Sequence, residues 1–348
     1  MKNLLAVLRY ALLLRGNPNI KRTDVLSILR EAEKQTVIGI VFNEIGNRQL
    51  AIDKEKVFEY IGLIQQIEQQ NRLQNAVLKE LSRLMDTHGV RYAIVKGQIA
   101  GLNYPEPLIR QSGDIDIYCA EDDFQNAKTN IEKEWGVEFR GDANTHHHIE
   151  VEYKGVPIEL HHKLIKLYSK KKDFYWKKIC QQSFMKVDIG GVEVYILTPT
   201  LHVLYIFLHL YHHLLELGVG LRQFCDWAMM LHSKESEIDF LLLRKHLVIL
   251  GMERAYRACG VVLVDGLGLK EKEIGYILSK KDRYYGKKII DIVAYRGNMG
   301  KYNKKLGFNG VMHKLEAAGI KMSHFIKLWR LAPSYSLAWI WSEFWREI

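Results

Sequence analysis

Two aspartates separated by one residue are the feature of this sequence best suited to chemistry. Asp114 and Asp116 alternate with Ile115 and Ile117 in the segment Ser112–Tyr118. On a β-strand both carboxylates would leave the same face, while the isoleucines would enter the core. Two adjacent carboxylates repel each other unless a cation neutralises them, and such oxygen ligands suit Mg²⁺ or Mn²⁺ carrying a nucleoside triphosphate. We therefore predict a metal site at Asp114 and Asp116.

A predicted β-hairpin supplies a third carboxylate. Alternating apolar and polar residues flank Lys154-Gly155, which is typical of a two-residue turn. Counting outward from this turn puts the apolar residues on one face, and on the other face it places Glu150 opposite Glu159 and His148 opposite His161. Like charges directly opposite each other cost stability, unless a metal or acid–base chemistry uses them. We predict Glu159 as the third metal ligand with His161 beside it, and a simple solvent-exposed polar face is the alternative.

A lysine and a glycine follow the strand predicted upstream of the aspartates. The apolar run Tyr92–Val95 leads directly into Lys96 and Gly97. Backbone amides at a glycine-containing turn that opens a helix bind anions, and a lysine adds a positive charge. We interpret Lys96 and Gly97 as a phosphate-binding turn, with an ordinary strand–loop junction as the alternative. Arg110 could orient a phosphate through its forked guanidinium, and a structural ion pair is an equally good interpretation.

A second group of polar residues lies farther along the chain, on predicted helices. His209 and His213 are four residues apart and share a helix face, as metal ligands can. Arg222 and Asp226 have the same spacing. No acidic residue accompanies the histidines at the spacing of known zinc motifs. We therefore favour packing or nucleotide contact for His213, Arg222 and Asp226 over a hydrolytic metal site.

The hydrophobic patterns divide the chain into three predicted parts. Residues 1–88 and 198–348 show apolar positions at spacings of three and four, as in helices, and residues 89–197 contain short β-type runs. We predict an α+β fold, in which a small mixed β-sheet core is flanked by N-terminal and C-terminal helical regions. The expected strands are 92–95, 115–119, 149–153, 156–160, 184–189 and 192–197. The expected helices include 57–85, 198–217, 220–232, 237–250, 252–265 and 270–279.

The composition sets the broad class of the protein. Its 348 residues are 48% hydrophobic and 26% charged, with a formal net charge of +10 at pH 7. This composition is typical of a folded globular protein, and the positive charge would attract nucleotides, nucleic acid or an acidic membrane surface. The four cysteines lack the spacing of a disulfide framework or a zinc site, which favours a reducing, cytoplasmic location. No apolar run reaches the roughly 20 residues of a membrane span, and we expect an amphipathic helix over residues 1–16 instead of a signal peptide.

The final segment of the chain is rich in tryptophan. Trp329, Trp339, Trp341 and Trp345 lie among lysines and arginines. Interfacial helices near anionic lipids have such a composition, and so do terminal helices that pack on a core. We favour packing on the core, and a partner surface or peripheral membrane contact stays open.

The motifs around the aspartates resemble those of a known family. In chain order they are Val95-Lys96-Gly97, Tyr104-Pro105, Arg110, Asp114-Ile115-Asp116 and Ile158-Glu159-Leu160-His161. Through them, residues 90–165 resemble the uncharacterised nucleotidyltransferases of bacterial polysaccharide-biosynthesis gene clusters, with a weaker likeness in residues 198–232. These proteins belong to the superfamily of DNA polymerase β-like nucleotidyltransferases, whose core is a small mixed sheet with helices on one side.

The resemblance implies a reaction. A nucleotidyl group would pass from a nucleoside triphosphate to an unknown hydroxyl or phosphate acceptor, with Asp114, Asp116 and Glu159 around Mg²⁺ and with a role in surface polysaccharide biosynthesis. It also implies that the region of His213, Arg222 and Asp226 closes over the nucleotide. Three alternatives stay open: an inactive nucleotide-binding protein, a scaffold for nucleic acid or membrane, and a metal-dependent glycosyltransferase. The second is disfavoured because no RNA-binding motif of basic and aromatic residues is present, and the third because the repeated strand–helix–strand pattern is missing.

Overall fold

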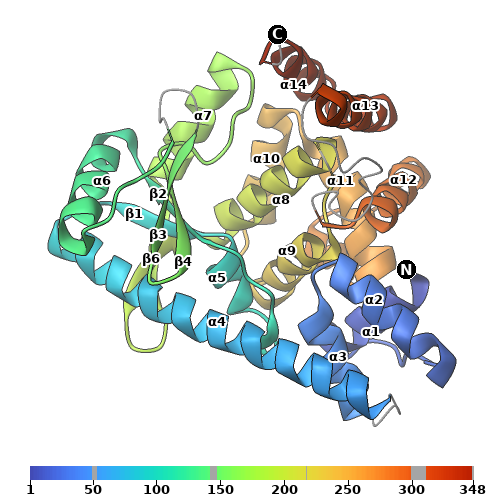
Figure 1. Ribbon diagram of the computed structural model, residues 1–348. Helices are drawn as coiled ribbons and strands as arrows, with labels where there is room; N and C mark the ends of the chain where they lie inside the picture. Colours follow the sequence, from blue (N-terminus) through green and yellow to red (C-terminus); the bar gives the residue numbers. More distant parts are fainter. Residues whose placement is uncertain (49–52, 142–146, 217, 299–310, 347–348) are drawn as a thin grey trace. The chain divides into compact units, whose positions relative to one another are not determined.

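The computed structural model describes residues 1–48, 53–141, 147–216, 218–298 and 311–346. Over these residues the protein is α+β, with one six-stranded mixed sheet and many helices, which confirms the predicted fold class (Figure 1). The chain divides into two compact units. The first, Gly62–Tyr205, contains the whole sheet, and we call it the sheet unit. The second combines Met1–Ile61 with Ile206–Ile348, and we call it the helical unit.

The sheet unit alternates strands and helices. Its strands are β1 (Tyr92–Val95), β2 (Ile115–Cys119), β3 (His148–Tyr153), β4 (Val156–His161), β5 (Phe184–Asp188) and β6 (Glu193–Leu197). Its helices are most of α4 (Lys54–Thr87), with α5 (Gly97–Gly101), α6 (Glu121–Trp135), α7 (Lys170–Gln181) and the start of α8 (Pro199–Leu215). The expected strands are confirmed to within one residue at each end, whereas the expectations did not include α6 and α7.

The strand order is β3-β4-β2-β1-β6-β5. β2 is antiparallel to β1 and parallel to β4, and the outer pairs β3–β4 and β5–β6 are antiparallel hairpins. Lys154 and Gly155 form the first hairpin turn with positive φ angles of 51° and 76°, as a type I′ turn requires. The predicted hairpin register is confirmed, since Glu150 lies opposite Glu159 and His148 opposite His161.

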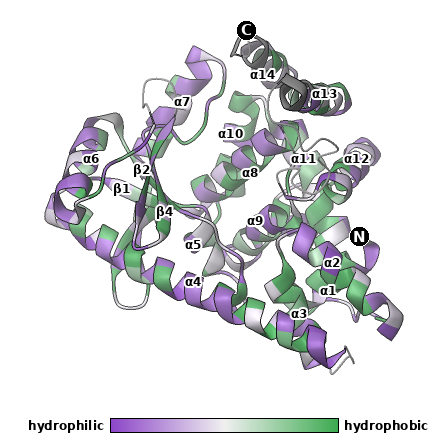
Figure 2. Cartoon of the chain, in the orientation of Figure 1, coloured by the Kyte–Doolittle hydropathy of each residue, from purple (hydrophilic) through white to green (hydrophobic). Residues whose placement is uncertain are grey.

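The two faces of the sheet differ in chemistry. The apolar face carries Ile115, Ile117, Ile158 and their neighbours, and it packs against apolar residues of α4 and α6 to form one core (Figure 1). Much of α4 and α6 is coloured hydrophilic in Figure 2, because only one stripe of each helix meets the sheet. Successive side chains on a strand point to opposite faces, so Asp116 and Glu159 lie on the face turned away from this core.

The helical unit contains the remaining helices. They are α1 (Lys2–Leu13), α2 (Val25–Lys34), α3 (Ile38–Asn47), α9 (Leu221–Ser233), α10 (Phe240–Leu250), α11 (Glu253–Val261), α12 (Lys280–Arg296), α13 (Val311–Leu328) and α14 (Pro333–Arg346). Cap hydrogen bonds define some of their starts: the Asp239 side chain accepts from the backbone N–H of Leu242 at 2.9 Å, and Ser279 and Asp282 form a capping box.

The helix expected over residues 270–279 is wrong. The chain forms only a short 3₁₀ turn, Glu271–Ile274, and then Gly275 takes the left-handed conformation at φ 69°. Such a glycine ends a helix, and Ser279 starts the next one. The expected helix 252–265 is also divided, because α11 passes into a π-helical turn at Val262–Leu267.

The tryptophans of the last segment differ in exposure. Trp339 is fully buried, as expected for packing on a core, whereas Trp341 is 65% exposed. The side chain of Trp345 lies outside the described residues. Among the helices that the structure describes, none combines the length and the apolar character that a membrane span needs.

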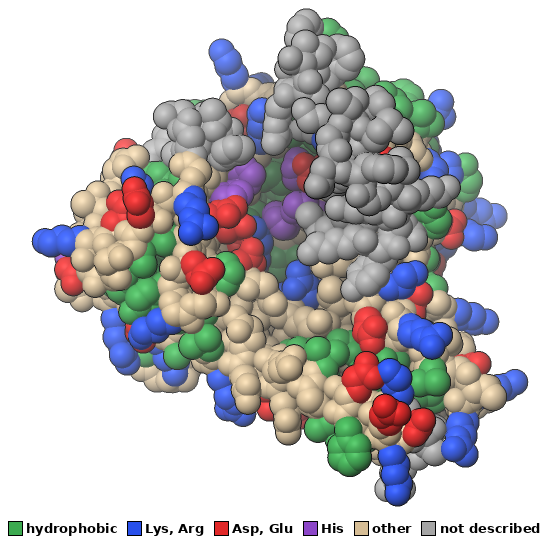
Figure 3. Space-filling model, viewed as in Figure 1, with side chains coloured by type: hydrophobic (Ala, Val, Ile, Leu, Met, Phe, Trp, Pro, Cys, Tyr) green, Lys and Arg blue, Asp and Glu red, His purple; other side chains and the backbone are tan. Residues whose placement is uncertain are grey.

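Surface charge is mixed on the face seen in Figure 3. Lys and Arg side chains are spread over it and interspersed with Asp and Glu. The excess positive charge is therefore not gathered into one patch on this face, as it would be in a protein that tracks a nucleic-acid backbone.

Candidate functional site

Sheet register brings the predicted carboxylates together. Asp116 on β2 lies directly beside Glu159 on the parallel strand β4 and beside Val95, the last residue of β1. Asp114 precedes β2 by one residue. Adjacent strands are only about 4.8 Å apart, so side chains of one register row meet on the same face. Three acidic residues therefore gather around the centre of the sheet.

Polar side chains on the neighbouring helices fix the loop that carries Asp114. On α4, the amide of Asn71 donates to the backbone oxygen of Arg110 at 2.8 Å, and that of Gln74 donates to Gly113 at 2.7 Å. On α5, the amide of Gln98 donates to the backbone oxygen of Asp114 at 3.1 Å. These contacts satisfy backbone carbonyl groups that are not paired with a neighbouring strand. Side-chain hydrogen bonds therefore hold the loop in place of the backbone hydrogen bonds of a β-sheet. The sequence analysis missed all three side chains.

Lys96 reaches the buried aspartate directly. Its Nζ lies 2.6 Å from Oδ1 of Asp116, and the two side chains are 17% and 3% exposed. The backbone of Lys96 has φ 56° and ψ −122°, a combination that glycine adopts much more readily. Such strained conformations cost about 1–3 kcal/mol and concentrate at functional sites. The backbone N–H of Lys96 donates to Nε2 of His202 at 3.3 Å, a histidine that the sequence analysis did not identify.

His161 is the second partner of this aspartate. Its Nε2 lies 2.9 Å from Oδ1 of Asp116 and 3.1 Å from Oε2 of Glu159, and the ring is 1% exposed. Burial alone would lower the pKa of His161, but the hydrogen bonds to both carboxylates outweigh burial and raise it. His161 therefore links the two acidic residues through one nitrogen.

The carboxylates have opposite pKa shifts. Burial would raise the pKa of Asp116, but the charge of Lys96 and the hydrogen bond from His161 hold it below its ordinary value. The negative charge of Asp116, followed by burial and the charge of Glu159, raises the pKa of Asp114 to about 7. For Glu159, burial is outweighed by the hydrogen bond from His161, so its pKa is lowered. An added cation would therefore reduce the electrostatic repulsion at Asp114 more than at the other two carboxylates.

These residues fit a divalent cation with oxygen ligands. Ligand atoms of Asp116, Glu159 and His161 all lie within 4.8 Å of one another. Asp114 is outside this set, but it is close enough for its pKa to respond to both other carboxylates. A surplus of negative charge that raises a neighbour's pKa to about 7 is the electrostatic condition that Mg²⁺ or Mn²⁺ would satisfy.

Gly97 and Arg110 lie beside this group. A Cβ atom on Gly97 would be 3.7 Å from the backbone oxygen of Asp114 and 3.8 Å from Nη1 of Arg110. Arg110 is 4% exposed, so its guanidinium is held under the Gly97 turn and not extended into solvent. The structure thus brings Lys96, Gly97 and Arg110 to the aspartates, and their contact with a phosphate stays a prediction.

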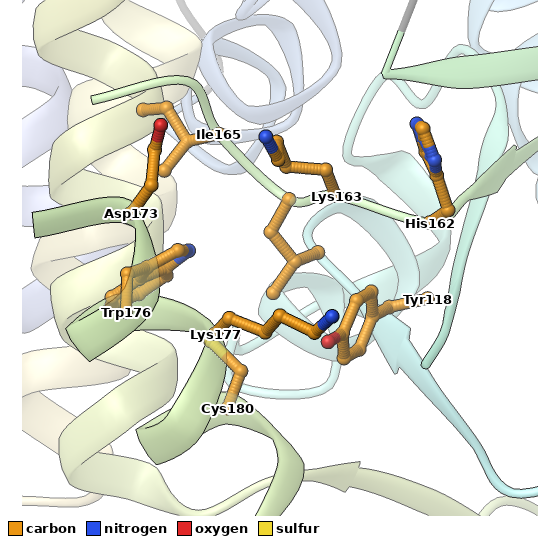
Figure 4. A pocket seen from close by; sticks show the side chains of 9 residues that line it. Tyr118, His162, Lys163, Ile165, Asp173, Trp176, Lys177 and Cys180 are labelled. Carbon is orange, nitrogen blue, oxygen red and sulfur yellow. The ribbon is translucent and has the colours of Figure 1, made fainter. Parts of the chain in front are cut away.

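A small pocket lies on the same face of the sheet (Figure 4). Tyr118, two residues after Asp116 on β2, forms one wall, and Lys163, Trp176 and Lys177 line the rest together with neighbouring residues. Its volume is about 20 Å³, enough for about one water molecule. The pocket is therefore too small to hold a nucleotide.

The other predicted residues belong to the helical unit. Nε2 of His213 lies 3.0 Å from Nε2 of His209, and its Nδ1 lies 3.1 Å from Glu216. The backbone N–H of Arg222 donates to the oxygen of Gln35 at 3.3 Å, and Asp226 is 7% exposed. These are local contacts within the helical unit. The role of His213, Arg222 and Asp226 in binding a nucleotide stays a prediction.

Comparison with known proteins identifies the family of the chain. No curated protein matches the chain. Among solved structures, an antigenic nucleotidyltransferase-like protein from Paracoccidioides brasiliensis matches with a TM-score of 0.38 and 16% identity, over 61% of this chain and 96% of the other. The profile of a family described as uncharacterised nucleotidyltransferase matches residues 21–264, well over half of the chain and including every residue of the site. The chain is therefore a member of this uncharacterised nucleotidyltransferase family.

Proposed function

We propose that the sheet unit transfers a nucleotidyl group from a nucleoside triphosphate to a hydroxyl or phosphate acceptor, with Mg²⁺ or Mn²⁺ bound by Asp114, Asp116 and Glu159. The observation that carries the proposal is the placement of Asp116 and Glu159 in one register row of parallel strands, with Asp114 next to them. Membership of a nucleotidyltransferase family supports it. The divalent cations would neutralise the triphosphate and stabilise the attacking and leaving oxygens.

Glu159 is the residue best placed to accept a proton. Its side chain is 21% exposed, against 3% for Asp116, and its lowered pKa keeps it ionised at neutral pH. Glu159 would take the proton of the acceptor hydroxyl as the acceptor oxygen bonds to the α-phosphorus. The bond from the α-phosphorus to the bridging oxygen then breaks, and pyrophosphate leaves. A phosphate acceptor would already be ionised and would need no such base.

Lys96 and His161 position the carboxylate of Asp116. Both donate to the same oxygen of Asp116, so they hold this side chain in one orientation on the sheet face. Lys96 also brings a positive charge to a position where three carboxylates would otherwise repel an incoming triphosphate. We propose that Arg110 and Gly97 shape the adjacent turn toward the phosphates.

Nucleotide binding and turnover test the proposal. ATP, GTP, CTP and UTP are titrated calorimetrically into the full chain with Mg²⁺, and into an Asp114→Asn/Asp116→Asn variant. We expect binding to one or more triphosphates that needs Mg²⁺ and weakens at least about 100-fold in the variant. Glu138→Gln, which changes an exposed acidic residue of the same unit, is the matched control and should bind as the wild type does. Absence of binding by well-folded wild-type protein would contradict the proposal.

Turnover separates the proposed reaction from its rivals. Release of pyrophosphate and transfer of a labelled α-phosphate are measured with polyol, sugar and sugar-phosphate acceptors. The resemblance to nucleotidyltransferases of bacterial polysaccharide gene clusters makes precursors of surface polysaccharides the first acceptors to try. Preference for a nucleotide sugar over a triphosphate in a competition titration would favour a glycosyltransferase. Binding without transfer to any acceptor would favour an inactive nucleotide-binding protein.

A further inference from the structure

Three imidazole rings lie together at the open end of the β3–β4 hairpin. The ring centroids of His147 and His148 are 4.6 Å apart, those of His148 and His161 are 5.0 Å apart, and those of His147 and His161 are 5.7 Å apart. One ligand nitrogen from each ring can be chosen so that all three lie within 4.8 Å of one another. Small side-chain rotations would therefore bring three nitrogens to the distances of a common metal ion, about 2.0–2.1 Å each.

The hairpin fixes the positions of these residues. His148 begins β3 and His161 ends β4, and the two lie directly opposite each other, so their side chains project from the same face. His147 precedes β3, and its backbone oxygen accepts from the N–H groups of His162 at 3.3 Å and Lys163 at 3.4 Å. The three histidines thus lie on a hydrogen-bonded frame.

Two of the rings have one nitrogen on a carboxylate and the other without a partner. Nε2 of His161 contacts Asp116 and Glu159, and Nε2 of His148 lies 3.2 Å from Glu150. Nδ1 of both His148 and His161 is buried and makes no hydrogen bond to the described residues. A buried polar atom without a partner costs about 1–3 kcal/mol. A ring that gives one nitrogen to a carboxylate and keeps the other for a metal is the usual arrangement of metal-binding histidines.

We propose that His147, His148 and His161 bind a divalent transition-metal ion of the zinc type, distinct from the Mg²⁺ proposed for the carboxylates. Imidazole nitrogens prefer zinc, cobalt, nickel and copper, whereas Mg²⁺ takes oxygen ligands. Glu150 and Glu159 lie 3.2 and 4.0 Å from Nε2 of His148, the nitrogen that would not bind the ion. This inference does not depend on nucleotide binding.

The ion would act on the neighbouring site through His161. With its Nδ1 bound to a metal, a neutral imidazole carries its proton on Nε2, and Nε2 can then only donate. The ion would therefore fix His161 as the donor to Asp116 and Glu159. The proposed role of the ion is to set the orientation of these carboxylates.

Cobalt binding tests the proposal. The full chain is prepared without a histidine tag, because a tag would bind the same ions, and is freed of metal by chelation. We expect one equivalent of Co²⁺ to give the visible absorption of a nitrogen-liganded ion, Zn²⁺ to displace it, and millimolar Mg²⁺ to leave it in place. His147→Ala/His148→Ala should weaken Co²⁺ binding at least about 100-fold, since it removes two of three nitrogen ligands. Circular dichroism verifies that this variant is folded.

Two controls locate the ion. His209→Ala/His213→Ala removes a close histidine pair of the helical unit, and it should leave Co²⁺ affinity unchanged. Asp114→Asn should also retain the Co²⁺ spectrum, so a failure of the proposed transfer reaction would not affect the result. Equal Co²⁺ affinity of the wild type and the His147→Ala/His148→Ala variant would overturn the proposal, as would loss of binding only in the His209→Ala/His213→Ala variant.

Discussion

Two clusters of histidines and carboxylates, one on the sheet and one at the end of α8, are built differently. At the C-terminal end of α8, one carboxylate contacts two histidines: Glu216, the residue after the helix, lies 3.2 Å from His212 and 3.1 Å from His213. On the sheet, three carboxylates surround one histidine and one lysine. The helix cluster can neutralise its own charge, whereas the sheet cluster has surplus negative charge. This difference is why we place the cation-dependent chemistry on the sheet.

The two clusters also differ in how far apart in the sequence their residues lie. The helix cluster comes from residues three and four apart in sequence, the spacing that places side chains on one helix face. In the sheet cluster, Lys96, Asp116, Glu159 and His161 come from β2, β4 and the end of β1. Such a cluster depends on the register of the whole sheet. The helix cluster needs only one helix.

Removing the central carboxylate of each cluster should have the largest effect. Asp116→Ala leaves the buried ammonium of Lys96 without its counter-ion, so we expect a loss of about 3–5 kcal/mol in the free energy of unfolding. Glu216→Ala leaves histidines, which can lose their protons, so we expect a smaller loss of about 1–3 kcal/mol. Urea unfolding at pH 8 measures both values. A larger loss of unfolding free energy for Glu216→Ala than for Asp116→Ala would contradict this expectation.

Asp114 of the sheet cluster and Glu216 of the helix cluster should contribute to stability with opposite dependences on pH. The pKa of Asp114 is raised to about 7, so the folded state holds this proton more tightly than the unfolded chain does. Stability from this group is therefore present at low pH and declines as pH rises from about 4 to 7. The pKa of Glu216 is lowered, because the hydrogen bonds from His212 and His213 outweigh burial. Its contribution to the stability of the fold is therefore present above the ordinary pKa of 4.5 and is lost as pH falls.

Single substitutions separate these contributions. Asp114→Asn should remove the decline between pH 4 and 7, by about 1–4 kcal/mol, and Glu216→Gln should remove the decline below pH 4.5. Denaturant unfolding at intervals of pH from 3.5 to 8 gives both profiles. A wild-type stability that rises between pH 5 and 7, unchanged by Asp114→Asn, would contradict the assignment of Asp114.

Glycines in the two units should tolerate alanine differently. A Cβ on Gly286 of α12 would be 2.3 Å from Cβ of Val261 on α11, so Gly286→Ala should cost about 1–3 kcal/mol through overpacking. At Gly97 the nearest atom would be 3.7 Å away, which is ordinary contact. Gly97→Ala should therefore fold normally. If it also binds the Mg²⁺–triphosphate as tightly as the wild type, Gly97 does not form the phosphate turn.

The smallest effect is expected at the hairpin turn. Lys154 has a φ of 51°, which asparagine adopts more readily in a type I′ turn. Lys154→Asn also removes a partly exposed ion pair with Glu80 at 2.7 Å, which contributes about 0–1 kcal/mol. The free energy of unfolding should change by less than about 1 kcal/mol, as measured by urea unfolding. A larger loss would show that the stability of the sheet depends more on this turn than on the register of its strands.

Local patterns predicted much of this site. The turn at Lys154-Gly155 and the strict alternation around it determine the hairpin register, so Glu159 and His161 could be assigned by counting. The alternation of Asp114 and Asp116 with isoleucines likewise predicted β2. Both features are properties of a few consecutive residues.

Long-range contacts were beyond the sequence analysis. Asn71 and Gln74 are polar residues within a long helix, where such residues usually face solvent, and only the packing of α4 on the sheet turns them toward the Asp114 loop. His202 was recognised as part of a helix but not as the partner of Lys96. The metal-binding potential of His147 was also missed, because it depends on the distance between β3 and the end of β4.

The boundaries of the sheet unit have a practical consequence for anyone who wishes to study it in isolation. The chain enters the unit at Gly62, inside α4, and leaves it at Tyr205, inside α8. Cutting at these points would create two new helix ends, and each would leave up to about four backbone groups without intrahelical partners. A truncated protein should therefore begin before Lys54 and extend past Leu215, even though the added turns belong to the other unit. Limited proteolysis at these two points should be slow for the same reason, because proteases need an extended backbone.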